Sequence, residues 1–170
     1  LQVKQLSTAN IQALTSDQVK ALSVAALQSL SSTQVAALDT VDVAQLSTGQ
    51  IRALSNGGLS GLTTAQVNNI GTQQVAAFSA EQLKVLSSNQ LVALSTAQAA
   101  ALTSTQMAGL APTQIAAMQT EDVAALTTRA IGAMSAAQVQ GLTTAQVAGL
   151  STTQAAGLGA TQVGALTSTQ

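Results

Sequence analysis

The segment "LTTAQVAGLSTTQAAGLGATQVGAL", from Leu142 to Leu166, decides the fold because it states one octapeptide three times in succession. Its consensus is L-[ST]-T-x-Q-V-x-[AG], and the same register extends through the 170-residue chain without an insertion or a deletion. A period this strict indicates that each repeat contacts its neighbours in the same way. The sequence therefore predicts a repeat protein.

Two apolar columns run through the repeats. The first column begins at Leu6, recurs every eight residues over 21 positions and ends at Leu166. Seventeen of its members are Leu, and the others are Ile70, Phe78, Met118 and Met134. The second column lies five residues further on, from Ile11 to Val163, and its smallest members are Ala99 and Ala155. We expect both columns to be buried, and we expect the first two positions of each predicted helix to be exposed.

Each repeat contains the signals that start a helix. The Ser or Thr after the first-column residue suits the N-cap, and the Gln three residues later completes a capping box. The first-column residue and the second-column residue then flank the cap as a hydrophobic staple. Gln fills this third helical position in 15 of 21 repeats, whereas Ala26, Gly58 and Ala130 break the box. Asn10, Asp42 and Asp122 are plausible substitutes for the glutamine.

The rarer residues obey the same helical frame. Pro112 is the one proline, and it falls at a first helical position, where its missing N–H is tolerated. Acids gather at the predicted helix starts and bases at the ends, as the helix dipole favours. The acids are Asp17, Asp39, Asp42, Glu81, Glu121 and Asp122, and the bases at helix ends are Lys4, Lys20, Arg52 and Lys84. Arg129, near a helix start, is the exception.

These observations predict an all-α solenoid of about 21 short helices, each of one to two turns, with one helix per octapeptide. The alternative is a β-solenoid, but the alanine content is poor for strands. A single continuous helix is disfavoured because the first column would drift by about 80° per repeat. Helices this short are unstable alone, so each must pack on its neighbours. We expect roughly four to six repeats per coil of the spiral, a number that leaves room for a narrow apolar core.

The domain prediction is a single continuous array over residues 1–170. The stretch from Leu54 to Leu62 crowds Gly57, Gly58 and Gly61 into one repeat, and we interpret it as a locally loosened coil. The array begins and ends in mid-repeat without a polar terminal cap, which predicts that it belongs to a longer array or stacks on further copies. Head-to-tail contacts between such copies would not close, and they would generate filaments.

The composition contains few of the residue types that catalyse reactions or bind metal ions. The chain has no His and no Cys, which removes the common general base and the thiol nucleophile. Asp39 with Asp42, and Glu121 with Asp122, are the closest acids, but each suits a capping position. We therefore predict no catalytic, cofactor-binding or metal-binding residues, and no enzyme activity. The net charge of −1 disfavours nucleic-acid partners, and no apolar run is long enough to span a membrane.

The repeats "LSTAQAAAL", "LTTAQVAGL" and "LSTTQAAGL" resemble the octapeptide tracts of very large bacterial surface and secreted proteins of the adhesin or calcium-binding-toxin (RTX) type. The resemblance covers essentially the whole chain. It implies an extracellular or cell-surface structural array, and it brings no catalytic residues. The Gly- and Asp-rich nonapeptide that binds Ca²⁺ in such proteins is absent here.

Function is accordingly predicted as a structural module of an extracellular bacterial fibre, stalk or filament, with further copies of itself as the partner. The alternative is a surface-binding adhesin, or an ice- or carbohydrate-binding array that uses exposed rows of Ser and Thr. The core prediction can be tested by substitution. A charge at Leu94 or Leu102 should break the packing, whereas Asp at Thr96 should be nearly silent.

Overall fold

The computed structural model describes residues 3–170, which fold into short helices joined by sharp corners. These residues form one 3₁₀ helix and 20 α-helices of four to six residues, and they form no strand. The all-α solenoid prediction is confirmed, with one helix in nearly every octapeptide. The chain divides into two compact units, Leu1–Leu86 and Ser87–Gln170. A single continuous array over residues 1–170 stays a prediction.

The helices of the first unit follow one another at eight-residue intervals. They are η1 (Val3–Gln5), α1 (Thr8–Gln12), α2 (Ser16–Lys20), α3 (Val24–Ser29), α4 (Ser32–Ala37), α5 (Thr40–Ala44), α6 (Thr48–Ala53), α7 (Asn56–Leu59), α8 (Thr64–Asn69), α9 (Thr72–Ala77) and α10 (Ala80–Lys84). The second unit keeps the same interval. Its helices are α11 (Ser88–Val92), α12 (Thr96–Ala100), α13 (Ser104–Gly109), α14 (Pro112–Ala117), α15 (Thr120–Ala125), α16 (Thr128–Gly132), α17 (Ala136–Gln140), α18 (Thr144–Ala148), α19 (Thr152–Ala156) and α20 (Ala160–Val163).

The corners between helices are built by N-caps in extended conformation, with φ between −80° and −63° and ψ between 142° and 166°. At 15 of the 20 helices in residues 3–170 the cap hydroxyl accepts from the N–H of the third helical residue. The caps without such a bond are Asp39, Gly71, Ala111, Gln119 and Gly159. Pro112 occupies the first helical position of α14, as predicted. No described residue has a positive φ, so the corners need no left-handed glycine.

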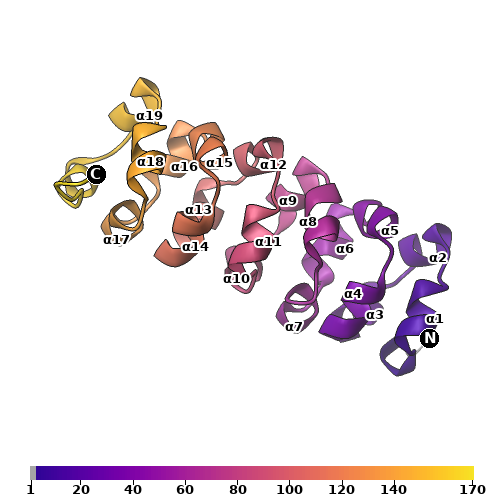
Figure 1. Cartoon of the computed structure of the whole chain (residues 1–170). Coiled ribbons are helices and arrows are strands. Elements are labelled where there is room, and N and C mark those ends of the chain that lie inside the picture. Colours follow the sequence, from indigo (N-terminus) through magenta and orange to yellow (C-terminus); the bar gives the residue numbers. More distant parts are fainter. Residues whose placement is uncertain (1–2) are drawn as a thin grey trace. The chain divides into compact units, whose positions relative to one another are not determined.

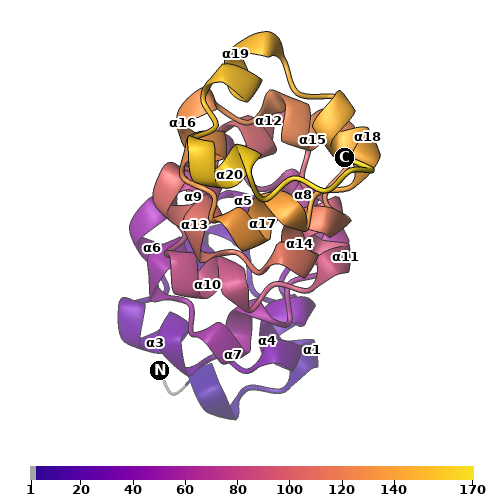
Figure 2. The same cartoon turned by 90° about the vertical axis from the view of Figure 1, so that its left-hand side faces the viewer.

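Within each unit, a helix packs against the third helix after it. In unit 1, α1, α4 and α7 form one row and α2, α5 and α8 another; in unit 2, α11, α14 and α17 form a row beside α12, α15 and α18 (Figures 1 and 2). A coil therefore closes between three and four repeats, which is tighter than the four to six that we expected. Small side chains at the helix ends make the tighter turn possible because successive coils approach closely there.

The two apolar columns form the core, as predicted. The first column is buried from Leu30 to Leu142 and half-buried in the terminal coils, at Leu6 and Leu166 for example. The second column is buried from Ile11 to Val139, whereas Val163 is 50% exposed. This asymmetry shows that the second column faces the following coil, which covers it. The spiral therefore has a direction.

The first two positions of each helix were predicted to be exposed, and the structure confirms this for the second position but not for the first. The second residue of every α-helix is exposed. The first residue is partly covered in about half of the helices, because the end of a later helix packs on it. A β-carbon at Gly141 would lie 2.9 Å from Pro112 Cβ, and one at Gly149 would lie 3.0 Å from Thr120 Cγ2. In both pairs a first helical residue meets a helix end 29 residues later.

The glycine-rich repeat is a correction of the same kind. The sequence suggested a loosened coil, but α7 keeps the register and buries Gly58 and Leu59. A β-carbon at Gly61 would fall 2.0 Å from the Ser32 carbonyl oxygen, and one at Gly58 would fall 3.1 Å from the Leu30 carbonyl oxygen. These glycines therefore permit a close approach between coils.

Candidate functional site

The polar residues with a consistent structural role are the glutamines of the third helical position, here called the glutamine column. Most of them are buried, including Gln66, Gln138 and Gln146. Each Oε1 accepts from the backbone N–H of its own N-cap, as Gln66 does from Thr63 at 2.8 Å. This is the capping contact that the sequence predicted, and it gives the amide oxygen of the side chain its partner.

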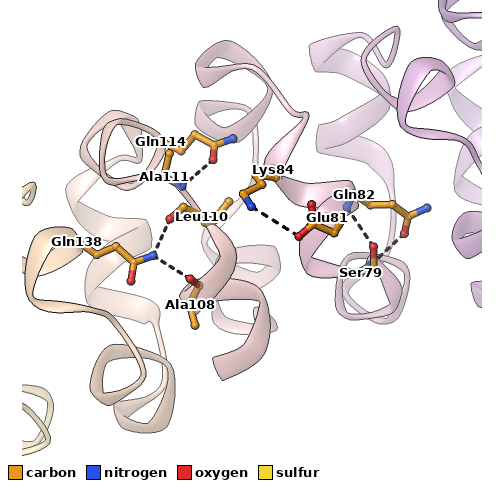
Figure 3. Close-up of polar contacts among 9 residues, drawn as sticks. All are labelled: Ser79, Glu81, Gln82, Lys84, Ala108, Leu110, Ala111, Gln114 and Gln138. Carbon is orange, nitrogen blue, oxygen red and sulfur yellow. Dashed lines mark hydrogen bonds and ion pairs between the residues drawn. The ribbon is translucent and has the colours of Figure 1, made fainter.

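The amide nitrogen of ten of these glutamines reaches the preceding coil. Gln66 Nε2 donates to the carbonyl oxygens of Leu38 at 2.7 Å and Val35 at 2.9 Å. Gln138 Nε2 donates in the same way to Leu110 at 2.6 Å, with Ala108 at 3.4 Å (Figure 3), and to Met107 at 2.8 Å. Its acceptors are the first-column residue 28 positions earlier and the second-column residue 31 positions earlier. They lie at the end of the helix four repeats before.

Each such glutamine therefore caps two helices. The last carbonyls of an α-helix have no partner within the helix, and a donor from outside must satisfy them. Ten glutamines donate to the first-column carbonyl 28 residues earlier within their own unit. They are Gln34, Gln50, Gln66, Gln74, Gln82, Gln138, Gln146, Gln154, Gln162 and Gln170. In nine of them Oε1 closes the N-terminus of one helix and Nε2 closes the C-terminus of another, whereas Gln170 lies in a turn beyond α20. The column thus connects coil to coil within each unit.

This second contact does not follow from the capping pattern, although the sequence contains a signal for it. Glutamate can also close a capping box, and its charge would favour a helix start. Yet the third position is Gln in 15 of 21 repeats and Glu in none. Only the amide carries a donor, so the absence of Glu from this position indicates an N–H requirement that capping alone does not explain.

The paired acids occupy this same frame. Asp39 is the N-cap of α5 but makes no side-chain cap bond. Asp42 and Asp122 sit in the glutamine column and are buried. Each is bonded to the hydroxyl at the first helical position 26 residues earlier: Ser16 Oγ donates to Asp42 Oδ1, and Thr96 is the partner of Asp122. Both acids thus bond the preceding coil, where the sequence suggested only a capping role.

Two further contacts of charged side chains lie outside the glutamine column, one exposed and one partly buried. Lys84 Nζ lies 3.6 Å from Glu81 Oε1 on α10, and both side chains are mostly exposed (Figure 3). Arg52 Nε donates to the carbonyl of Ala77 at 3.1 Å. Within residues 3–170 no three His, Cys, Asp or Glu side chains gather closely enough to hold a metal ion. No helix among these residues has the length and apolarity needed to cross a membrane.

Two grooves of the first unit include a charged side chain: Lys4 in the smaller, of about 300 Å³, and Arg52 in the larger. The larger groove has a volume of about 710 Å³, and its lining includes Arg52, Asn56 and the largely buried Phe78, the only aromatic residue of the chain. Hydroxyls of Ser55 and Ser79 also line it, but each accepts a backbone N–H as an N-cap. The lining contains no carboxylate, so a base beside a hydroxyl nucleophile is absent from it.

The comparison with protein families gives a match along more than half of the chain. The model of the ALTTAQ repeat matches residues 43–80, 75–112 and 115–152. Curated proteins yield no relative that matches. The matched segments contain the capped helices, both columns and the glutamine column described above.

Proposed function

The chain belongs to the ALTTAQ repeat family, and from this premise we propose that it is a spacer in an extracellular bacterial fibre, stalk or filament. It is a structural repeat module, and its role in that setting is to fix length and stiffness. The observation that carries the proposal is the glutamine column. Its side chains connect each coil to the one before it through backbone groups that every repeat possesses.

The glutamine contacts support a mechanical role because they do not depend on the identity of the neighbouring side chains. Gln146 and Gln154 each donate to the end of a helix four repeats earlier, at 2.8 Å and 2.7 Å. A polar contact made to backbone can be repeated in any number of coils. Adding coils therefore lengthens the module without a new kind of contact, as in other solenoids.

Self-association is part of the proposal. In unit 2 the second column is buried from Leu91 to Val139, whereas Val163 on α20 is half exposed. A further coil, from the same chain or from a second copy, would cover this surface by the contacts that bury Val139. Contacts of this head-to-tail kind produce filaments when they do not close. The proposal assigns no catalysis to the chain and places adhesive or enzymatic work in other domains.

Immunogold electron microscopy of the source cells tests the proposal. Antibodies raised against the 170-residue chain should label extended material outside the cell, and the labelled antigen should have a mass set by the whole fibre protein. Antibody adsorbed with the purified chain is the control. Label confined to the cell interior would contradict the proposal. Specific retention of the chain on a glycan array or on ice would favour the binding-array alternative.

A further inference from the structure

The position of Asp122 in the glutamine column has a consequence for pH. In later repeats of the same unit the amide nitrogen at this position donates to two backbone carbonyls, as Gln138 and Gln146 show. Aspartate is one methylene shorter, and when ionised it can only accept. Its side chain is 2% exposed, and Oδ2 has no hydrogen-bond partner.

The carbonyls that a glutamine at residue 122 would reach follow from the register. They belong to Leu94, 28 residues earlier, and to Leu91, 31 residues earlier, at the end of α11. The N-cap residue Gln119 supplies one donor to this helix end, since its Nε2 donates to Val92 O at 3.0 Å. No amide is present for Leu94, and an ionised Asp122 would add a negative charge where the repeats that carry glutamine bring a partly positive N–H hydrogen.

We propose that Asp122 takes up a proton in mildly acidic solution and that its Oδ2–H then acts as the donor to the end of α11, so that this coil is held more tightly in acid than at neutral pH. A metal ion is a poorer occupant, because hard cations such as Ca²⁺ take six to eight oxygen ligands. A proton needs a single acceptor. The inference does not depend on the fibre role.

The electrostatic surroundings support a proton. Burial raises the pKa of Asp122, and the charge of the adjacent Glu121 raises it further, while the Thr96 hydrogen bond lowers it. The helices packed against α15 are α12 and α18, and neither contains a charged residue. Glu121 on α15 itself is therefore the charged neighbour to consider. No basic side chain of these helices compensates the buried carboxylate.

The direction of the pH effect follows from linkage. The folded chain holds the Asp122 proton more tightly than the unfolded chain does, because the folded-state pKa is raised. Stability is then greatest below the pKa of an unfolded aspartate, and it falls as the pH rises toward the folded-state pKa. Above the folded-state pKa, the stability that the Asp122 proton contributes is lost completely.

Urea unfolding of the full 170-residue chain from pH 3 to pH 8 tests the proposal. The wild-type midpoint should fall with rising pH relative to the midpoint of Asp122→Asn, which keeps the shape and carries an amide donor at every pH. Glu121→Gln should retain the wild-type trend. Parallel profiles for wild type and Asp122→Asn would overturn the proposal.

Two further measurements remove the remaining alternatives. Carbon-13 NMR of the Asp122 carboxyl in the wild-type chain should show it titrating above the ordinary range for aspartate, and a normal titration would overturn the proposal even if the variant failed to fold. Addition of 5 mM CaCl₂, or exchange of KCl for NaCl, at pH 7.5 should leave the difference between wild type and Asp122→Asn unchanged. Recovery of the wild type alone would assign the site to a cation instead.

Discussion

Gly61 lies directly on the backbone of Ser32, one coil earlier: a β-carbon at residue 61 would fall 2.0 Å from the Ser32 carbonyl oxygen. Gly61→Ala should therefore force the coils apart and lower the free energy of unfolding by about 2–3 kcal/mol, as overpacking does. Urea unfolding followed by circular dichroism at 222 nm measures the loss.

Gly49→Ala is the matched control for this substitution. Gly49 lies near the start of α6, and an added β-carbon would meet nothing closer than Ser47 Oγ at 3.9 Å. Because alanine is the better helix former, the free energy of unfolding of this variant should rise by up to about 1 kcal/mol. Equal effects at residues 49 and 61 would show that the Gly61 contact does not limit the packing.

The buried first column predicts a strong response to charge at Leu94, which is 2% exposed. Leu94→Asp should lower the free energy of unfolding by about 4 kcal/mol or more, since it removes a buried aliphatic side chain and leaves an unpaired charge. A thermal melt of the variant measures the loss, and an unchanged melting temperature would refute the packing model.

The matched control for Leu94→Asp is Ala97→Asp and not Thr96→Asp, which the sequence suggested. Asp at Thr96 was expected to be silent, but the Thr96 side chain bonds the buried Asp122, so a second carboxylate there would be destabilising. Ala97 is exposed at the second position of α12. Ala97→Asp should change the stability by less than about 0.5 kcal/mol, or raise it slightly through the helix dipole.

Adding a capping hydroxyl where the N-cap residue lacks one should raise the free energy of unfolding. Ala111 precedes α14 in extended conformation and offers no side-chain oxygen, although its N–H still donates to Gln114 Oε1 at 2.9 Å. Ala111→Ser should add about 1 kcal/mol by supplying the cap. Ser95→Ala should cost about the same amount, because the Ser95 hydroxyl accepts from Gln98 N. Two changes of the same sign in urea unfolding would contradict the capping account.

Local structure could be predicted from the sequence because each octapeptide carries its own start signals. The N-cap hydroxyls, the position of Pro112 and both apolar columns follow from short-range rules. The number of repeats per coil could not be predicted, because it depends on small corner angles that add up over several repeats. For the same reason, the contact of Gly61 with Ser32 was not foreseen, since its partner lies 29 residues away.

The candidate site shows the same division. The hydrogen bond that the Ser135 N–H donates to Gln138 Oε1 joins residues of one repeat, so the capping pattern predicts it. The bonds from Nε2 to Met107 and Leu110 require the coil to close at one particular length. Asp122 was interpreted as a helix-start acid, and its burial against Thr96 became visible only once the coils were in place.

The central claim is that the glutamine column connects each coil to the one before, and the most direct test compares Gln138→Glu with Gln18→Glu. Both glutamines accept the N–H of their N-cap through Oε1, at 2.6 Å and 2.9 Å, but Gln138 is buried against the preceding coil while Gln18 is exposed. At pH 7, Gln138→Glu should lower the free energy of unfolding by about 3 kcal/mol, since the carbonyls of Met107, Ala108 and Leu110 lose the Nε2 donor and meet a carboxylate, and only Met107 keeps a second donor, the Leu110 N–H. Gln18→Glu should change it by less than about 0.5 kcal/mol. Equal, small changes in the urea midpoints of the two variants would contradict the claim.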